Sequence, residues 1–273
     1  MELDSQSLVS VIVPTYNSSK FLDACLQSVR SQTYSNIELI VVDNNSTDES
    51  MEIASKYSDK VVTHGPERSA QVNHGVELAS GKYIYKVDSD FLLDRQVIDE
   101  CIKKTRQGFD AVVVHNSPDN KVGWIARIRK FEVDMYKYDI THSSARFVNK
   151  QIFLRIGGFD ENITAGEDYD FQNRLNRAGV KTGFIDAEAL HLGEPKHFWH
   201  HMSKYFYYGK DFKYYREKNL LESKRQLKFL RSAYLKHWRR FVRHPFLAIA
   251  FAFYNICKFV AGGLGYAVAK SNK

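Results

Sequence analysis

Short runs of β-branched residues alternate with helical patterns through the first half of this 273-residue chain. Residues 9–13 and 37–42 are runs of this kind, and each ends in a turn-rich segment, as buried strands do. Apolar residues then recur at helical spacing between Phe21 and Val29. Strands that alternate with helices favour a mostly parallel sheet flanked by helices. The chain is therefore expected to form an α/β fold.

The same alternation predicts the elements that follow. The helix after the second strand is expected to begin with Ser46 as its N-cap and Glu49 three residues later. Apolar spacing between Trp124 and Tyr136 predicts a helix lying over the sheet. This helix is expected to contribute to acceptor binding or, equally, only to cover the sheet. Further strands are expected at 61–62, 83–87 and 111–114, and further helices near 69–79, 96–106 and 168–178.

Charge divides the chain into two parts. Residues 1–195 hold 22 Lys and Arg against 29 Asp and Glu, whereas residues 196–273 hold 17 against 3. A mildly acidic body with a basic, aromatic tail favours an anionic membrane surface as partner and argues against nucleic acid. We expect a catalytic domain over residues 1–215 and a helical tail for membrane association over residues 216–273.

The tail combines apolar and basic residues at helical spacing. This pattern predicts a basic amphipathic helix from Leu220 onward, lying on a membrane or, alternatively, docked on the catalytic domain. Residues 246–269 are long enough to span a bilayer, but Asn255 and Lys258 interrupt them. We expect this segment to lie in the interface or re-enter. The apolar positions of the first helix are Leu227, Leu230, Tyr234, Trp238 and Phe241.

Cysteine usage and the N-terminal sequence both predict a cytoplasmic location. Cys25, Cys101 and Cys257 are odd in number and widely spaced, which fits neither a disulfide framework nor a zinc site. The first residues are polar and lead directly into a strand, without the basic and apolar regions of a signal peptide. Peripheral or monotopic attachment at the cytoplasmic membrane face is expected.

Polar residues follow three of the predicted strands. Tyr16, Asp43 and Asp88 come directly after strands, and ligands of open α/β sheets lie beyond these carboxyl ends. Asp88 and Asp90 occupy alternate positions, so both carboxylates can approach one hard cation such as Mg²⁺ or Mn²⁺. Taken alone, the triplet 88–90 fits two solvated loop acids better than a metal site.

Five motifs occur in a fixed order along the chain. They are VIVPTYN (11–17), VVDNNSTD (41–48), DSD (88–90), GGFD (157–160) and GEDYDF (166–171). Together they resemble the family 2 inverting glycosyltransferases of GT-A fold, over about residues 8–193. The resemblance implies a Rossmann-like GT-A domain, a nucleoside-diphosphate sugar donor (a UDP or GDP sugar) and a divalent cation, Mn²⁺ or Mg²⁺.

By this resemblance, the first motifs bind the nucleotide. The ring of Tyr16 would stack on the base, and Asp43 would accept a hydrogen bond from base or ribose; the alternative is a plain turn and a helix cap. Many relatives carry the phosphate-binding arginine at the position where this chain has Val72. Arg68 would bind the phosphate here or, alternatively, be a solvated surface arginine. The full nucleotide-binding set is Pro14, Tyr16, Asn17, Asp43, Arg68, Asp88 and Ser89.

The resemblance also assigns the metal ligands and the base. Asp88, Asp90 and His191 would hold the cation, although a lone histidine is often only structural. Asp168 would be the general base and Glu167 would position a sugar, while both also fit an acidic helix N-terminus.

The resulting interpretation is an inverting transferase that acts on a hydroxyl of a lipid-linked, polyprenyl saccharide. The first alternative is a polyprenyl-phosphate sugar synthase, whose acceptor is already an anionic phosphate and needs no base. The second is a non-catalytic, nucleotide-sugar-binding membrane protein.

Overall fold

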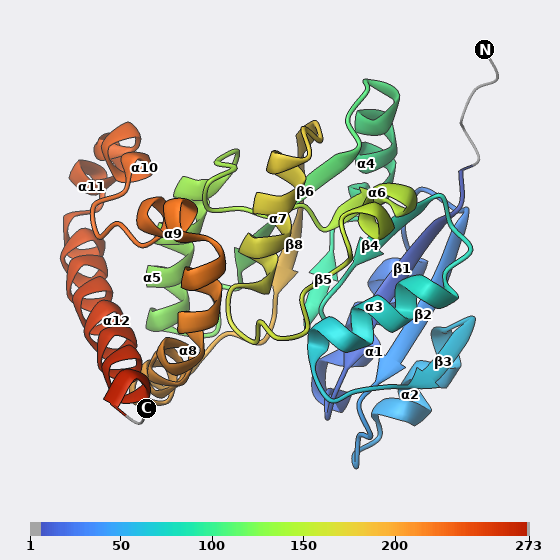
Figure 1. Ribbon diagram of the computed structural model, residues 1–273, viewed down its shortest axis with the longest axis horizontal. Helices are drawn as coiled ribbons and strands as arrows, with labels where there is room; N and C mark the ends of the chain where they lie inside the picture. Colours follow the sequence, from blue (N-terminus) through green and yellow to red (C-terminus); the bar gives the residue numbers. More distant parts are fainter. Residues whose placement is uncertain (1–6, 272–273) are drawn as a thin grey trace. The chain divides into compact units, whose positions relative to one another are not determined.

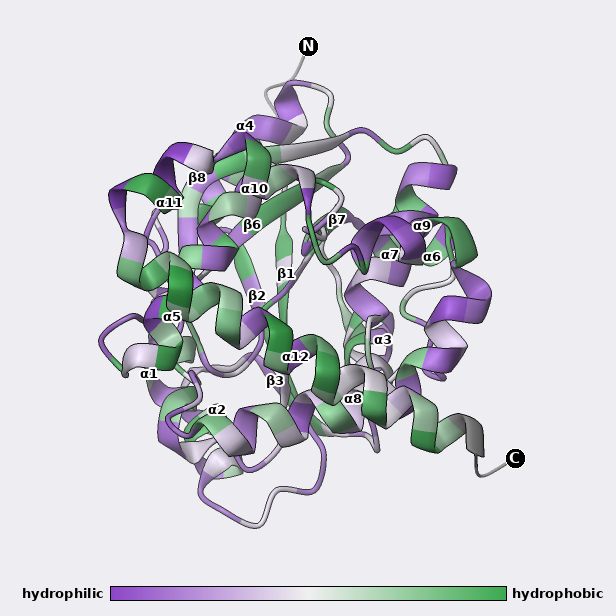
Figure 2. Ribbon diagram, turned by 90° about the vertical axis from the view of Figure 1, so that its left-hand side faces the viewer, coloured by the Kyte–Doolittle hydropathy of each residue, from purple (hydrophilic) through white to green (hydrophobic). Residues whose placement is uncertain are grey.

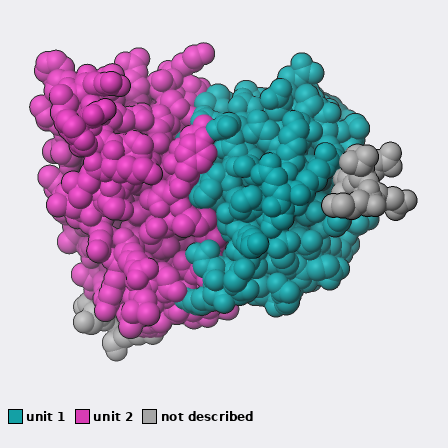
Figure 3. All heavy atoms as spheres, turned by 90° about the horizontal axis from the view of Figure 1, so that it is seen from above, with its two compact units in different colours: residues 1–116, 144–161, 174–193 teal, residues 117–143, 162–173, 194–273 magenta. Residues whose placement is uncertain are grey.

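The computed structural model describes residues 7–271, which form two compact units (Figures 1 and 3). The polar residues 1–6, used above to predict the cytoplasmic location, lie outside the described range. Unit 2 takes segments from both the predicted catalytic domain and the predicted tail, so the division at residue 215 stays a prediction. Within the described range, unit 1 consists of residues 7–116, 144–161 and 174–193, and unit 2 of residues 117–143, 162–173 and 194–271.

Unit 1 holds the sheet and the helices that flank it, and unit 2 is helical. The strands are β1 (Val9–Thr15), β2 (Ile37–Asp43), β3 (Lys60–Thr63), β4 (Tyr83–Lys86), β5 (Phe91–Leu93), β6 (Ala111–Pro118), β7 (Phe147–Asn149) and β8 (Thr182–His191). The helices of unit 1 are α1 (Ser19–Arg30), α2 (Ser50–Tyr57), α3 (Arg68–Leu78), α4 (Val97–Arg106) and α6 (Lys150–Arg155). The remaining helices are α5 (Trp124–Val133), the 3₁₀ helix η1 (Asp134–Tyr136), α7 (Glu167–Arg177), α8 (Phe198–Lys218), α9 (Leu220–Gln226), α10 (Ser232–Lys236), α11 (Trp238–Arg243) and α12 (Pro245–Ser271).

The sheet has a parallel half and a half that contains antiparallel pairs. Its strand order is β3-β2-β1-β4-β7-β6-β8-β5. Strand β1 pairs in parallel with β2 and β4, and β2 with β3, in a register that sets Thr15 opposite Asp43. Strand β7 is antiparallel to β4 and β6, and β8 is antiparallel to β5. The predicted α/β fold is confirmed, and the strands that the sequence analysis did not anticipate are β5, β7 and β8.

Alternation along β1 gives the sheet two covered faces. Val9, Val11 and Val13 are buried in one apolar cluster with side chains of α1, α2 and α4. On the other face, a Cβ on Gly75 of α3 would lie 2.6 Å from Cγ2 of Ile12. Only glycine allows this helix to lie so close to the sheet.

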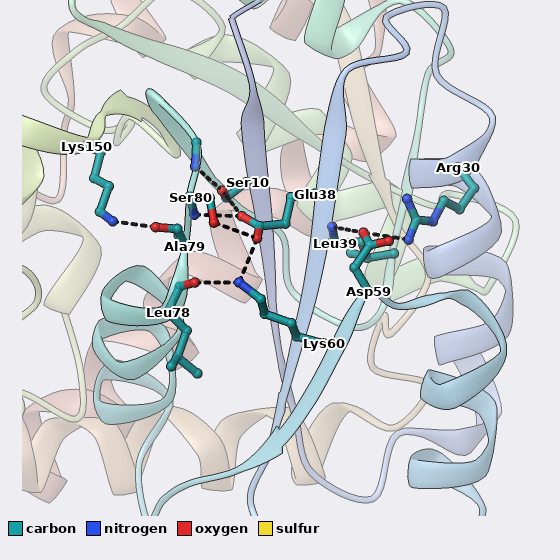
Figure 4. Close-up of polar contacts among 11 residues, drawn as sticks. Ser10, Arg30, Glu38, Leu39, Asp59, Lys60, Leu78, Ala79, Ser80 and Lys150 are labelled. Carbon is teal, nitrogen blue, oxygen red and sulfur yellow. Dashed lines mark hydrogen bonds and ion pairs between the residues drawn. The ribbon is translucent and has the colours of Figure 1, made fainter.

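Partly exposed ion pairs join β2 to its neighbours (Figure 4). Glu38 accepts hydrogen bonds from Ser10 Oγ at 2.5 Å, Ser80 N at 2.8 Å and Lys60 Nζ at 2.8 Å. Asp59 accepts from Leu39 N and from Arg30 Nη2, both at 2.8 Å. Burial would raise the pKa of Glu38, but its bonds to Lys60, Ser10 and Ser80 outweigh burial and lower the pKa to about 2.

Replacing Glu38 with glutamine is expected to lower stability at pH 7 by about 1–3 kcal/mol, because an ionised acceptor of three donors is lost. A depressed folded-state pKa stabilises the fold above the unfolded pKa, and that contribution is lost as the pH falls through the folded value. The deficit of the variant should therefore shrink between pH 5 and pH 2. Urea unfolding across this range measures it, with Glu52→Gln at an exposed pair with Lys56 as control. An equal deficit at both ends would contradict the assignment.

The start of α2 differs from the prediction. The helix begins at Ser50 after Glu49, so the assignment of Ser46 as N-cap is wrong. Ser46 instead donates its backbone N–H and hydroxyl back to Asp43, at 2.7 and 2.5 Å. The side chain of Asp48 accepts from Ser50 N at 3.0 Å in its place.

Unit 2 has its own apolar core. Side chains of α5, α8, α10 and α12 share it, including Phe131, Met202, Tyr234 and Tyr254. The helix expected over 124–136 forms as α5 and η1, and its apolar side contributes to this core.

The single amphipathic helix predicted from Leu220 onward is wrong. The segment forms three short helices, α9, α10 and α11. Leu230 and Trp238, expected on the same apolar face as Tyr234, are 76% and 57% exposed, whereas Tyr234 is buried. Contacts with η1 decide this, because the hydroxyl of Tyr234 lies 2.8 Å from that of Tyr136, and Arg231 donates to the same hydroxyl at 2.7 Å.

One helix among the described residues is long and apolar enough to cross a membrane. It is Pro245–Ala269 within α12, and only 22% of its most apolar window is buried. Length and composition therefore permit a span, and the helix is not the enclosed core helix of a soluble domain.

Candidate functional site

The parallel strands of unit 1 bring three predicted site segments to one edge of the sheet. Pro14 is buried near the end of β1, opposite Val42, and Tyr16 follows with 59% of its surface exposed. Asp43 ends β2 and is almost fully buried. An exposed ring beside a buried carboxylate suits a planar base with a polar edge.

The loops after β1 and β2 are tied together. Asn17 has a positive φ of 45°, its N–H donates to Ser46 Oγ at 2.8 Å, and its side-chain oxygen accepts from Thr47 N at 2.8 Å. Asn17 therefore holds the turn that presents Tyr16, while its role as a nucleotide contact stays a prediction.

Three cations surround the carboxylate of Asp88. Arg146 Nη1 lies 2.8 Å from its Oδ2, and Arg68 Nη1 and Lys86 Nζ lie 3.6 and 3.9 Å from its Oδ1. Burial would raise the pKa of Asp88, but the charges of Arg146, Lys86 and Arg68 outweigh burial and hold it well below its ordinary value. Asp88 is thus ionised within a positive environment, which suits a ligand that carries phosphates.

One oxygen of this carboxylate has ion-pair partners but no hydrogen bond. Within residues 7–271, Oδ1 of Asp88 is buried and accepts no hydrogen bond. Buried acceptor atoms normally have a hydrogen-bond partner, so this atom suits a hydroxyl of a bound ligand or a bound cation. Its neighbour Ser89 donates instead to Ser18 Oγ at 2.8 Å, which links the triplet to the start of α1.

Arg146 and Lys86 were missed by the sequence analysis. Arg146 precedes the three-residue strand β7, and it reaches Asp88 only because β7 pairs with β4. Lys86 did carry a signal, since a lysine in an otherwise apolar strand is buried only when it is paired.

Arg146→Gln is expected to weaken UDP or GDP binding at least about 10-fold, because Asp88 would then repel the diphosphate without its nearest counter-charge. Stability should fall as well, by about 3–5 kcal/mol as for other broken buried pairs. Calorimetric titration at a temperature where the variant stays folded measures the affinity. Arg95→Gln, at an exposed arginine, is the matched control. Unchanged nucleotide affinity would remove Arg146 from the site.

Asp90 and His191 form the pair best placed to hold a cation. Oδ2 of Asp90 lies 3.0 Å from Nε2 of His191, and both side chains are partly exposed. The pairing of β5 with β8 brings them together, with Phe91 opposite His191. A Cβ on Gly193 would overlap with Oδ2 of Asp90, so the absence of a side chain at Gly193 leaves room for this carboxylate.

The donor atoms fit a divalent cation. Carboxylate oxygen and imidazole nitrogen suit Mn²⁺, and hard cations take further ligands from substrate phosphates. Among residues 7–271, no group of three or more His, Cys, Asp or Glu side chains is already assembled for a metal. Of the three predicted ligands, Asp90 and His191 are therefore the two that lie within 3.0 Å of each other, while Asp88 is paired with Arg146. The assignment of all three to a cation stays a prediction.

The predicted base and its neighbour belong to unit 2. Glu167 and Asp168 open α7 directly after Gly166, whose φ is +93°. Glu167 is buried and Asp168 half-buried. Asp170 accepts from Asn219 Nδ2 at 2.9 Å and is fully buried, which marks it as the structural acid of this motif.

Comparisons with known proteins agree with this architecture. GlyG from Streptococcus pneumoniae, a glycosyltransferase, is 38% identical over 116 residues, which is 40% of this chain and 38% of GlyG. The minor teichoic acid biosynthesis protein GgaB of Bacillus subtilis is 28% identical over 67% of this chain and 22% of its own. The chain thus spans less than two thirds of the length of these curated relatives.

A solved structure supports the fold. The mannosyltransferase PcManGT from Pyrobaculum calidifontis, in complex with GDP-Man and Mn²⁺, superposes with a TM-score of 0.60 at 17% identity, over 98% of this chain and 76% of its own. Residues 10–159, more than half of the chain, match the family described as Glycosyl transferase family 2. With its GT-A fold and this match, the chain belongs to glycosyl transferase family 2.

Proposed function

We propose that this protein is an inverting glycosyltransferase that moves a sugar from a nucleoside-diphosphate donor to a hydroxyl of a lipid-linked saccharide. One observation carries the donor half of the proposal. The ends of strands in unit 1 carry side chains suited to each part of such a donor. They are an exposed Tyr16, a buried Asp43, an ionised Asp88 and the Asp90–His191 pair. PcManGT, bound to GDP-Man and Mn²⁺, supports the same donor class.

The residues of unit 1 would bind the donor and its charge. Tyr16 would stack on the base, and Asp43 and Oδ1 of Asp88 would accept from base or ribose. Arg68, whose Nη1 lies 3.6 Å from Asp88, would contact a phosphate. Asp90 and His191 would hold Mn²⁺ or Mg²⁺, which neutralises charge on the departing diphosphate.

Asp168 would act as the general base. As the acceptor oxygen bonds to the anomeric carbon, the hydroxyl proton passes to the Asp168 carboxylate. The bond from the anomeric carbon to the diphosphate oxygen breaks, and its electron pair leaves with the nucleoside diphosphate. Displacement from the opposite face inverts the anomeric centre. Glu167 would position the sugar.

The membrane part of the proposal rests on the tail. A cytoplasmic enzyme attached to the membrane surface would meet a polyprenyl-linked acceptor at the headgroups. The basic residues after 195 and the exposed apolar residues of α12 support this location.

A thermal-shift panel tests the donor site. UDP, GDP and dTDP are each added with and without Mn²⁺ to wild type, Asp90→Ala and the control Asp99→Ala, whose side chain pairs with Lys103 on α4. A ligand at 100 times its Kd stabilises by about 2.7 kcal/mol, which is a clear shift. We expect a Mn²⁺-dependent shift with one nucleotide in wild type and the control, and none in Asp90→Ala. No shift with any nucleotide, together with no hydrolysis of nucleotide sugars, would favour a non-catalytic protein.

A further inference from the structure

Helix α12 is held in unit 2 by one of its faces. Phe251, Tyr254, Asn255 and Lys258 are buried, at the spacing of a single helix face. Behind them α12 packs along α8 at backbone distance, because a Cβ on Gly265 would overlap with the carbonyl of Phe206. The helix is therefore a fixed part of unit 2.

A buried charge pair belongs to the same face. Lys258 Nζ donates to both carboxylate oxygens of Glu132 on α5, at 2.8 and 2.9 Å. Arg231 lies 3.6 Å from Glu132, and Tyr136 donates to it at 2.9 Å. Burial would raise the pKa of Glu132, but Lys258 and Arg231 lower it to about 2, so the pair is ionised at neutral pH. A membrane span would pull Lys258 away from this partner and leave both charges in an apolar environment.

The opposite face of α12 is exposed and apolar (Figure 2). Seven large side chains recur every three or four residues, and we call them the apolar stripe. They extend over more than six turns, while Lys258 is the one charged residue among positions 245–269. The stripe consists of Phe246 (87% exposed), Ile249 (69%), Phe253 (59%), Ile256 (51%), Val260 (55%), Leu264 (57%) and Val268 (40%).

The charge around the stripe identifies what covers it. Residues 223–273 contain 11 Lys and Arg and neither Asp nor Glu. Directly before α12, Lys236, Arg239 and Arg243 are exposed, and Trp238 is 57% exposed with Arg239 at 5.8 Å from its ring centre. A tryptophan and cations beside an apolar helix face are the features of an interfacial membrane helix on anionic lipid.

We infer that α12 lies in the plane of an anionic bilayer, with the apolar stripe among the upper acyl chains and the cations of α10 and α11 on headgroup phosphates. The inference specifies the membrane contact of the proposed function, and it excludes both a span and a second copy of this chain as the cover of the stripe. Binding to vesicles needs neither nucleotide nor acceptor. The membrane inference can therefore fail while the proposed sugar transfer is supported, and sugar transfer can fail while the membrane inference is supported.

Vesicle co-sedimentation of the full chain tests the inference. Vesicles of neutral phosphatidylcholine, with or without 30 mol% phosphatidylglycerol, are mixed with wild type and three variants. The stripe variant is Ile249→Ser/Phe253→Ser/Ile256→Ser, the charge variant is Arg239→Gln/Arg243→Gln, and the control is Leu154→Ser, at an exposed leucine of α6 in unit 1. Circular dichroism and the nucleotide thermal shift verify that each variant is folded.

Wild type and the control should bind anionic vesicles well and neutral ones weakly. The stripe variant should lose more than about 10-fold in partitioning to anionic vesicles, since apolar area drives insertion. The charge variant should lose about 10- to 30-fold there and little on neutral vesicles, at about 5-fold per cation. Bound wild type should be released by alkaline carbonate, as a surface protein is.

Three results would overturn the inference. Equal partitioning of a folded stripe variant and wild type would show that the stripe does not contact lipid. Retention of wild type after carbonate would show a span. A lipid-free dimer in light scattering that the stripe variant abolishes, with no vesicle binding, would assign the stripe to a second copy.

Discussion

Asp90→Ala is expected to lower kcat/KM for sugar transfer by about 10³-fold or more. Its carboxylate lies 3.0 Å from Nε2 of His191. Without it the cation would keep only His191 and the predicted ligand Asp88, which is already paired with Arg146. The charge that develops on the diphosphate would then lose its main stabilisation. Loss of one preorganised electrostatic contact in an active site typically costs about 10²–10³ in rate, and loss of a metal more.

Release of nucleoside diphosphate, with a saturating donor and a membrane fraction as acceptor source, measures this effect. His191→Ala should give a smaller loss, partly recovered at high Mn²⁺, because Asp90 remains as a ligand. Asp99→Ala on α4 is the matched acid and should behave as wild type. If Asp90→Ala kept more than a tenth of the wild-type rate, the assignment of the cation to this pair would be wrong.

Asp168→Asn is expected to lower kcat by about 10²–10⁴-fold, since the amide cannot accept the proton of an acceptor hydroxyl. Nucleotide affinity in the thermal-shift panel should stay unchanged, because the proposed donor contacts all lie in unit 1. The chosen control is Glu217→Gln, at an exposed acid of α8 in unit 2.

This variant also separates the leading function from its closest rival. A polyprenyl-phosphate sugar synthase uses an acceptor that is already ionised, so it would tolerate the loss of the base. Near-normal transfer by Asp168→Asn to polyprenyl phosphate would establish the rival. A slow variant with intact nucleotide binding would support a hydroxyl acceptor.

Much of the candidate donor site was predictable because its signals are local. Tyr16, Asp43 and Asp88 each follow an apolar strand directly, and parallel pairing then places strand ends at one edge. Arg146 carried no such signal, since it meets Asp88 across 58 positions of sequence and only through the pairing of β7 with β4. Strand β8 has alternating burial in the structure, but its sequence contains few β-branched residues. Its strand signal was therefore weak.

In the tail, contacts between residues far apart in the sequence outweighed the local signals. Its composition predicted basic and apolar helices, but the periodicity from Leu220 to Phe241 was overridden by contacts that periodicity cannot reveal. Arg231 and Tyr234 are held at Tyr136, which lies 95 and 98 positions earlier in the chain. Lys258 looked like an obstacle to membrane insertion, and its partner Glu132 lies 126 positions away.

Gly193 gives the site a position at which a ligand can be displaced without being replaced. Because a Cβ there would overlap with Oδ2 of Asp90, alanine would push the carboxylate away from its present place beside His191 while leaving both donor groups in the chain. The distance between the Asp90 oxygen and the His191 nitrogen thus depends on Gly193, a residue that has no side chain with which to bind a metal. Preference between a smaller cation such as Mg²⁺ and a larger one such as Mn²⁺ depends on that distance. If Asp90 and His191 hold the cation as proposed, Gly193 is the position from which the choice of metal can be tuned separately from the chemistry of the ligands.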